Sequence, residues 1–275
     1  VRVVDVETVY DEFNDGIKSG YALRRFLHYA SQSWAQPKPI YVLLVGDASW
    51  DPMFKAANST MIDYVPSLGI PVSDYLLTVK IGDTSQASDY YIGRFPARSA
   101  AEAGNMVRKI IEYENLPPDA WNKRFVFLAG GGDGFQRSTF KELHEEIAAT
   151  YVLAPEFCGD TGMVVRTSPE NRLPFPDDLD ADWARSEINE GTLWVTFSGH
   201  GAVDIFDLNF GYPEDLNVGN RYFVLTTYSC QTGAYAEPGL VNRNERFVTS
   251  HTGAVASIGG TSFSYTDVDR VLKQG

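Results

Sequence analysis

The chain has 275 residues, of which 44% are hydrophobic and 21% charged, and its formal net charge is -13. This composition is that of a globular protein long enough to bury a substantial core, which sets aside disordered and fibrous classes. The negative charge, without any run rich in lysine or arginine, argues against nucleic acid as a partner. No run of about 18 apolar residues occurs, so no membrane span is predicted in this segment.

The first residues, 1–6, have the composition of a strand already inside a fold, with no signal peptide and no initiator methionine. We therefore expect the chain to be a segment of a longer precursor. Only Cys158 and Cys230 are present, which does not make a disulfide scaffold in a chain of this length. Because the histidines show no metal-ligand spacing with these cysteines, no zinc site is predicted.

The first half of the chain alternates between the patterns of helices and strands. Residues 22–30 have apolar positions three and four apart, which predicts an amphipathic helix. Residues 40–45 form a continuous apolar run, typical of a strand buried on both faces, and the run stops at Gly46 and Asp47. Ser99 and Glu102 have the spacing of a capping box and predict a helix that extends to about residue 114.

Pro117 and Pro118 are the predicted domain boundary, because paired prolines end a helix and stiffen a connection. The sequence then predicts strands at residues 124–129, 192–198, 222–228 and 253–259, with helices at 140–151 and 183–189. Nearly all-apolar strands interleaved with helices predict an α/β fold with a mainly parallel sheet. The expected organisation is an N-terminal α/β subdomain over 1–118 and a second α/β subdomain over 119–275.

Two of these strands end in reactive side chains. Residues 192–198 lead into Gly199, His200 and Gly201, and residues 222–228 lead into Ser229 and Cys230. Neighbouring parallel strands bring their carboxyl ends to one edge of a sheet, where α/β folds place their chemistry. A thiol becomes a nucleophile when a base lies nearby, and a histidine from another strand supplies that base. Either residue alone is more often structural, so the pair is the informative feature.

The glycines beside His200 extend this interpretation. They allow the backbone to approach a substrate closely, and the amides of Gly201 and Cys230 are candidate donors to a developing oxyanion. Cysteine proteases are found with the histidine either before or after the cysteine, and here His200 precedes Cys230. That order is the order found in caspases and differs from that of papain.

The chain resembles the gingipain-type cysteine peptidases, family C25, including the branch that contains the type IX secretion sortase. Matching segments follow the family's order and span almost the whole chain. They comprise residues 9–14, 41–47, 72–75, 92–96, 109–114 with Trp121, 198–201, 229–230 and 253–256. A single motif such as Gly199-His200-Gly201 is weak evidence, but the ordered set is strong.

This resemblance implies a caspase-like α/β fold of two packed subdomains and a catalytic Cys230/His200 dyad. It implies an exported protein at the cell surface or outside the cell, acting on protein or peptide substrates through a thioester. Propeptide or secretion-system partners are expected on the same ground, and no cofactor is required for the chemistry. A sortase-like transpeptidase and an inactive, gingipain-like binding module are the alternatives.

The chain also departs from the family's pattern. Some members place an acidic residue at the end of the strand after the linker to orient the histidine. Here that strand ends in three glycines, and Asp133 is the nearest substitute. The acidic residue behind arginine specificity has no clear counterpart. The family builds a pocket wall after the final strand, which assigns Phe263 and Tyr265 to substrate binding together with Ser198, although aromatic residues there are equally compatible with the core.

An acidic segment between residues 177 and 182 is the remaining candidate site. Its alternating carboxylates are hard oxygen ligands of the kind that calcium prefers. The candidate ligands are Asp177, Asp178, Asp180 and Asp182. The segment lacks the glycine and terminal glutamate of an EF-hand, so a structural calcium site stands beside the alternative of a solvated acidic loop.

Overall fold

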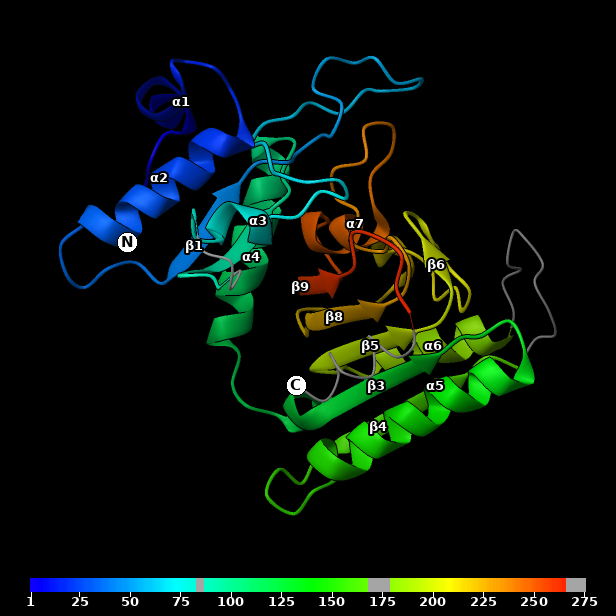
Figure 1. Cartoon of the computed structure of the whole chain (residues 1–275). Coiled ribbons are helices and arrows are strands. Elements are labelled where there is room, and N and C mark those ends of the chain that lie inside the picture. The colour runs from blue at the N-terminus through cyan, green and yellow to red at the C-terminus, as the bar shows by residue number, and fades with distance from the viewer. Residues whose placement is uncertain (83–86, 168–178, 266–275) are drawn as a thin grey trace. The chain divides into compact units, whose positions relative to one another are not determined.

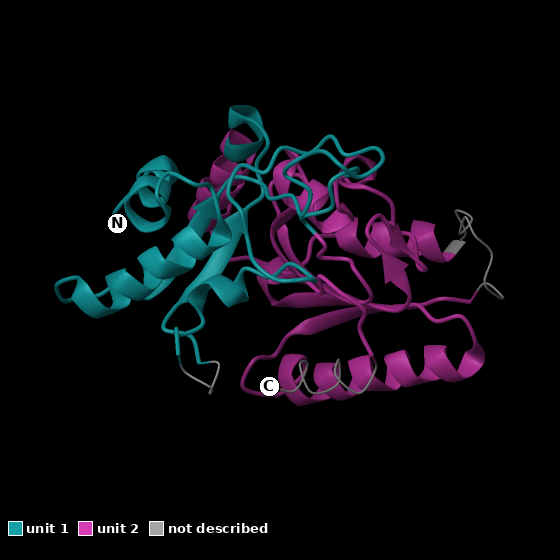
Figure 2. Cartoon of the chain, turned by 45° about the horizontal axis from the view of Figure 1, so that its top comes forward, with its two compact units in different colours: residues 1–103, 235–240 teal, residues 104–234, 241–275 magenta. Residues whose placement is uncertain are grey.

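The computed structural model describes residues 1–82, 87–167 and 179–265 (Figure 1). The chain divides into two compact units (Figure 2). Unit 1 comprises residues 1–103 and 235–240, and unit 2 comprises residues 104–234 and 241–275. This division falls inside helix α4 (Ala100–Asn115), earlier than the predicted boundary at Pro118.

A buried lysine explains why most of α4 belongs to unit 2. The side chain of Lys109 is fully buried. Its ammonium group donates to the backbone carbonyls of Phe247 (3.1 Å), Thr252 (3.2 Å) and Ala254 (2.6 Å). These carbonyls lie at the end of helix α7 (Arg243–Thr249) and at the start of strand β9 (Ala254–Gly259). Three acceptors match the three donors of an ammonium group, so α4 is anchored to unit 2.

Unit 1 contains helices α1 (Val6–Asn14), α2 (Gly20–Ser33) and α3 (Tyr75–Thr78) and two parallel strands, β1 (Tyr41–Val45) and β2 (Tyr91–Phe95). The strand-like opening of the sequence does not form a strand. Instead the Asp5 side chain accepts from the Glu7 amide (3.0 Å) and caps α1. The expectation that residues 40–45 are buried on both faces is also wrong, since Tyr41, Leu43 and Val45 are exposed.

Two of the family-like segments in unit 1 meet in a buried ion pair. Arg94 of β2 donates to both carboxylate oxygens of Asp74, at 2.8 and 2.7 Å. Its third nitrogen donates to the carbonyls of Gly46 (2.6 Å) and Val65 (2.8 Å), and the Tyr235 ring lies over the guanidinium at 5.1 Å. Burial alone raises the pKa of Asp74, but bonding to Arg94 outweighs it and holds the pKa below its ordinary value. These segments therefore have a structural role.

Unit 2 is built on a five-stranded parallel sheet in the order β4-β3-β5-β8-β9. The remaining strands are β3 (Arg124–Ala129), β4 (Asp160–Val165), β5 (Trp194–Ser198) and β8 (Phe223–Tyr228). A small hairpin, β6 (Gly201–Ala202) with β7 (Ile205–Phe206), follows β5. Short helices lie at Ala120–Lys123, Ala148–Val152 and Pro213–Asp215. The parallel sheet confirms the predicted fold class.

Helices cover both faces of this sheet. Helix α5 (Gly134–Ile147) lies on one face, where the ring of its His144 packs 5.2 Å from the ring of Phe127. On the other face, Val126 and Leu128, which flank Phe127 in β3, belong to a buried cluster that includes residues of helices α6 (Leu179–Asn189) and α7. Alternate residues of one strand thus enter different cores, which requires an apolar residue at nearly every position. Among the described helices, none has the length and apolar character to cross a membrane.

Candidate active site

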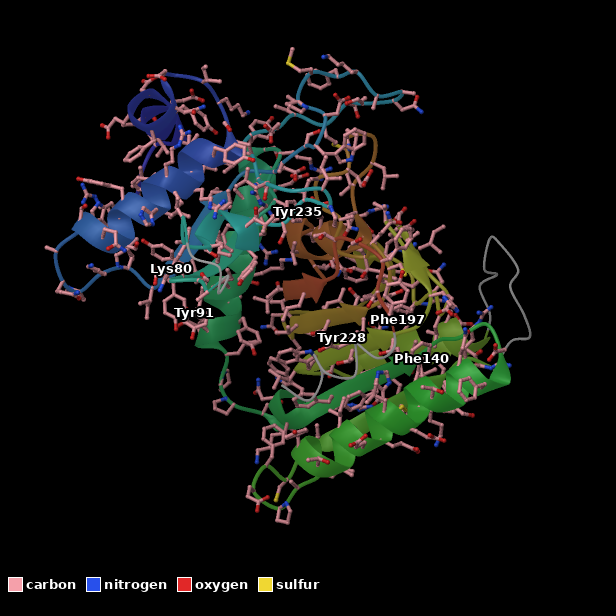
Figure 3. All side chains as sticks on the ribbon, viewed as in Figure 1. Lys80, Tyr91, Phe140, Phe197, Tyr228 and Tyr235 are labelled. Atoms are coloured by element: carbon pink, nitrogen blue, oxygen red, sulfur yellow. The ribbon has the colours of Figure 1, made fainter. Side chains whose placement is uncertain are left out.

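His200 and Cys230 lie at the same edge of the unit 2 sheet. Strands β5 and β8 are parallel neighbours, and Ser198 pairs with Tyr228 at their ends. His200 and Cys230 each follow two residues after this pair, so they leave the sheet at the same level. Neighbouring strands are about 4.8 Å apart, which brings the two loops side by side. Figure 3 labels Phe197 and Tyr228 near the ends of these strands.

The two loops are tied together at their bases. The Ser229 hydroxyl donates to the Gly199 carbonyl at 2.8 Å. A Cβ atom on Gly201 would lie 2.6 Å from the same hydroxyl oxygen. Only glycine allows the histidine loop to approach the cysteine loop this closely. Gly201 therefore sets the spacing between the two loops, whereas a Cβ atom on Gly199 would meet Asp207 Oδ1 at 2.3 Å.

Gln136 is the residue that contacts the His200 ring. Its side-chain oxygen lies 2.9 Å from His200 Nε2 and also accepts from the Gly132 amide at 2.8 Å. Asp133, the predicted partner, has a different role: it is exposed, and its carboxylate accepts from the Gln136 amide at 2.8 Å as the N-cap of α5. Asp133 and Gln136 have the spacing of a capping box, the one sequence signal that could have placed the start of α5 here instead of near Phe140.

A buried carboxylate lies beneath the glycines that end β3. Asp207 follows the β6–β7 hairpin, and its carboxylate accepts from the Gly131 amide at 2.7 Å. Arg166 lies 3.7 Å from the same oxygen, and both side chains are almost fully buried. Burial raises the pKa of Asp207. Hydrogen bonds from the backbone amides of Gly131 and His200 oppose this rise, and so do the positive charges of His200 and Arg166. The Asp207 amide also donates to the His200 carbonyl at 2.9 Å, which holds the loop from both sides.

Asp207 explains why β3 ends in glycine. A Cβ atom on Gly130 would lie 1.8 Å from Asp207 Oδ1. The carboxylate thus fills the space that a side chain at the end of the strand would need. An orienting acid cannot be presented from position 130 while Asp207 occupies this space.

Replacement of Gly130 by alanine is expected to lower the free energy of unfolding by about 2 kcal/mol, because the added methyl group overpacks a buried site. Urea unfolding of the purified chain measures this change. Gly134→Ala is the matched control, since a Cβ atom at Gly134 would meet no atom within 4 Å. Equal stability of the two variants would contradict the proposed packing of Asp207 against the glycine.

The segment after β9 lies against the Cys230 sulfur. The Ser264 amide donates to Sγ at 3.4 Å, and the thiol lies 3.7 Å from the Ser264 carbonyl. The Gln231 amide donates to the Ser262 carbonyl at 2.8 Å, which fixes the segment beside the cysteine loop. Phe263 and Tyr265, the predicted pocket residues, are both 69% exposed on this segment. They are available to a ligand beside Cys230.

The Ser264 amide is expected to stabilise the Cys230 thiolate, because a hydrogen bond to the charged form of an acid favours that form. Ser264→Pro removes this N–H and should slow the alkylation of Cys230 by iodoacetamide at pH 7, because only the thiolate reacts and less of it is stabilised. The rate of alkylation at fixed pH measures this effect. Ser264→Ala keeps the amide and should react at the wild-type rate; a proline variant that also reacts at the wild-type rate would rule out this stabilisation.

The hairpin after His200 presents the Gly201 amide. The Asp207 amide donates to the His200 carbonyl, and Gly201 is paired with Phe206 in the next position of the ladder. Hydrogen-bonded and non-hydrogen-bonded pairs alternate in an antiparallel ladder, so the Gly201 N–H points away from β7. Within the described residues, no backbone carbonyl accepts from the Cys230 amide. Both predicted oxyanion donors are therefore compatible with binding an acceptor.

The other predicted site residues lie elsewhere. Ser198 is fully buried, and its hydroxyl lies 2.8 Å from His144 Nε2, so a substrate would not reach this side chain. Asp177 and Asp178 lie outside the described residues. Of the other two candidate calcium ligands, Asp180 accepts from the amide and hydroxyl of Thr167, and the exposed Asp182 pairs with Arg185.

No group of three or more metal-ligating side chains is found across residues 1–82, 87–167 and 179–265. The described contacts of the acidic segment are therefore to protein donors. A calcium site formed with Asp177 and Asp178 stays a prediction.

The sequence model of Peptidase family C25 matches residues 1–275. The chain therefore belongs to peptidase family C25, as its motifs predicted. No curated protein sequence matches the chain.

Solved structures share the fold. The chain is similar to the Arg-specific cysteine proteinase gingipain R (RgpB), with 17% identity and a TM-score of 0.68, covering 96% of this chain and 60% of that one. It is also similar to the complex of Porphyromonas gingivalis RgpB pro- and mature domains, with 18% identity and a TM-score of 0.70, covering 96% and 59%. The chain thus spans less than two thirds of these proteins and has their caspase-like α/β fold.

Proposed function

We propose that this chain is the catalytic part of a cysteine peptidase in which Cys230 is the nucleophile and His200 is the general base and acid. The observation that carries the proposal is the common register of the two strand ends, which places a thiol and an imidazole at one sheet edge in a member of peptidase family C25. An exposed His200 and a half-buried Cys230 are both within reach of a substrate.

The proposed reaction begins when His200 takes the proton of the Cys230 thiol. The thiolate attacks the carbonyl carbon of the scissile peptide, and the resulting oxyanion accepts from the Gly201 and Cys230 amides. The carbon–nitrogen bond then breaks, and His200 gives its proton to the leaving amine. Water, deprotonated by His200, hydrolyses the thioester, which releases a carboxylate and restores the thiol.

Substrate recognition is proposed to involve the exposed segment that carries Phe263 and Tyr265. The Ser264 backbone of this segment contacts Cys230, its two aromatic rings are exposed, and none of residues 260–265 has an acidic side chain. We therefore expect an apolar or aromatic side chain of the substrate to contact this wall. A peptide library with systematic variation of the residue before the cleaved bond tests this expectation, and a strict requirement for arginine or lysine would contradict it.

The same library separates hydrolysis from peptide transfer. A hydrolase yields a new carboxylate even when a peptide amine is present in excess, whereas a sortase-like transpeptidase yields a ligated product. Mass spectrometry of the products distinguishes the two outcomes, and we expect the hydrolysed product. Ligated product alone would support the transpeptidase alternative, and cleavage by neither route would support a binding module.

The setting of the reaction is also proposed. Secretion to the cell surface or outside the cell, with a propeptide as an intramolecular partner, fits the family to which the chain belongs. One of the similar structures is a complex of pro- and mature domains, which makes a propeptide a reasonable partner to test. The mechanism itself uses only side chains and backbone amides of this chain and needs no cofactor.

A further inference from the structure

One residue beside His200 has no role in the reaction proposed above. Gln136 is the third residue of helix α5 and lies 64 positions before His200, so only the fold brings them together. The oxygen of its side chain accepts from the Gly132 amide and meets His200 Nε2. This arrangement defines which ring nitrogen carries the proton.

The Gly132 amide identifies which atom of the Gln136 side chain faces His200. A backbone N–H donates only to an acceptor, so the Gln136 atom that receives it at 2.8 Å is the carbonyl oxygen and not the amide nitrogen. That oxygen has no proton to give. His200 Nε2, which lies 2.9 Å from it, must therefore be the donor. In the neutral ring, the lone pair then resides on Nδ1.

We propose that Gln136 is the positioning residue of His200: its side-chain carbonyl holds the imidazole as the Nε2–H tautomer, so that Nδ1 exchanges the proton with Cys230. This inference rests on the proposed peptidase function. Because Nε2–H is a donor in both the neutral and the protonated ring, the bond to Gln136 persists through the whole proton-transfer cycle. The histidine can change its charge without changing its orientation.

A neutral amide differs from a carboxylate in one measurable respect. It orients the ring but adds no negative charge to stabilise the imidazolium. The charged and titratable groups on the elements that meet at His200 are Asp133 and Arg137 at the start of α5, Asp204 and Asp207 at the hairpin, and Cys230 after β8. The negative charge of Asp207 is balanced by Arg166, which follows β4. That of Asp204 is balanced by Arg243 at 3.3 Å. The carboxylate of Asp133 caps helix α5.

Three variants separate position from charge. Gln136→Met has a similar volume and helix propensity but no acceptor, so His200 should lose its tautomer preference. Gln136→Glu keeps an acceptor for the Nε2 proton and adds a negative charge near the N-terminus of α5, where such a charge is favourable, so His200 should keep the Nε2–H tautomer. Asp133→Asn keeps a good N-cap and should leave the His200 tautomer unchanged.

The direct readout is NMR of the full chain with ¹⁵N-labelled histidine, in which only four histidines contribute signals. Long-range ¹H–¹⁵N spectra report the tautomer of the neutral His200 ring, whose signals are assigned with His200→Asn. We expect Nε2–H in the wild type and in Gln136→Glu, and a tautomer mixture in Gln136→Met. An unchanged tautomer in Gln136→Met, or a change in Asp133→Asn instead, would overturn the inference.

A second readout links the residue to the reaction. Loss of ring orientation should lower kcat by about 100-fold with little change in KM, since misplaced catalytic groups lose rate more than binding. Gln136→Glu should restore most of this rate, because its carboxylate accepts the same Nε2 proton. If the wild type cleaves no peptide while the NMR results hold, the proposed function fails and the positioning of His200 stands. If the wild type and Gln136→Met cleave peptides at the same rate, the proposed function stands and the positioning role of Gln136 fails.

Discussion

Replacement of Cys230 by alanine is expected to lower peptide cleavage by at least about 10⁴-fold, because the thioester route disappears with the nucleophile. The half-buried side chain is small, so the fold should be retained. The measurement is the initial rate of cleavage of a peptide identified by library profiling, compared at equal concentrations of folded protein.

Two further variants make this result interpretable. His200→Ala should lower the cleavage rate by about 10²- to 10⁴-fold, which is the usual contribution of general acid and base catalysis by one side chain. Cys158→Ala removes the other cysteine, which is exposed and bonds only locally to Pro155 at 2.9 Å, and should keep full activity. Equal activity of Cys230→Ala and the wild type would eliminate the proposed nucleophile.

The largest expected effect on stability comes from the ion pair of unit 1. Asp74→Ala leaves the guanidinium of Arg94, which is 5% exposed, without its carboxylate. Removal of one partner from a buried pair commonly costs about 3 to 5 kcal/mol, because a charge stays buried without compensation. Urea unfolding at pH 7 measures the loss. Asp89→Ala is the control, since its pair with Lys80 is more exposed and should contribute less than about 1 kcal/mol.

The pH dependence of this pair has a definite sign. The pKa of Asp74 is lower in the folded chain than in the unfolded chain, because bonding to Arg94 outweighs burial. Its contribution to stability is therefore complete above the unfolded pKa near 3.9 and is lost as the pH falls through the folded pKa. The difference in unfolding free energy between the wild type and Asp74→Ala should shrink below about pH 4. A difference that grows on acidification would contradict the assignment.

The sheet of unit 2 could be predicted because its inner strands are apolar at nearly every position. Edge strand β4 was missed because it alternates between buried and half-exposed residues and includes Gly162. Helix α7 was missed for a different reason. Its first residues, Arg243, Asn244 and Glu245, are polar in sequence but buried in the fold. Long-range contacts, such as the pair of Arg243 with Asp204, make that burial favourable, and no local pattern contains them.

The candidate site also has one part that local sequence predicts and another that depends on long-range contacts. His200 and Cys230 could be predicted because each follows directly after an apolar strand, so that local sequence fixes its place at the sheet edge. Gln136 could not be predicted as a partner of His200, because the contact depends on how α5 packs against β3, next to β5 in the sheet. The sequence alone indicated that an acidic residue is missing at position 130. The structure gives another reason for the glycine: the carboxylate of Asp207, 77 positions later in the chain, occupies the space beside it.

Covalent labelling of Cys230 tests the central claim most directly. The full chain is incubated with a set of peptidyl chloromethyl ketones that differ in the side chain next to the ketone, and the adduct is located by mass spectrometry. We predict a single adduct on Cys230 that is absent from Cys230→Ala and forms at least about 100-fold more slowly in His200→Ala. Equal labelling of the wild type and Cys230→Ala, with the adduct on Cys158 or a histidine, would contradict the assignment of Cys230 and His200 as the reactive pair.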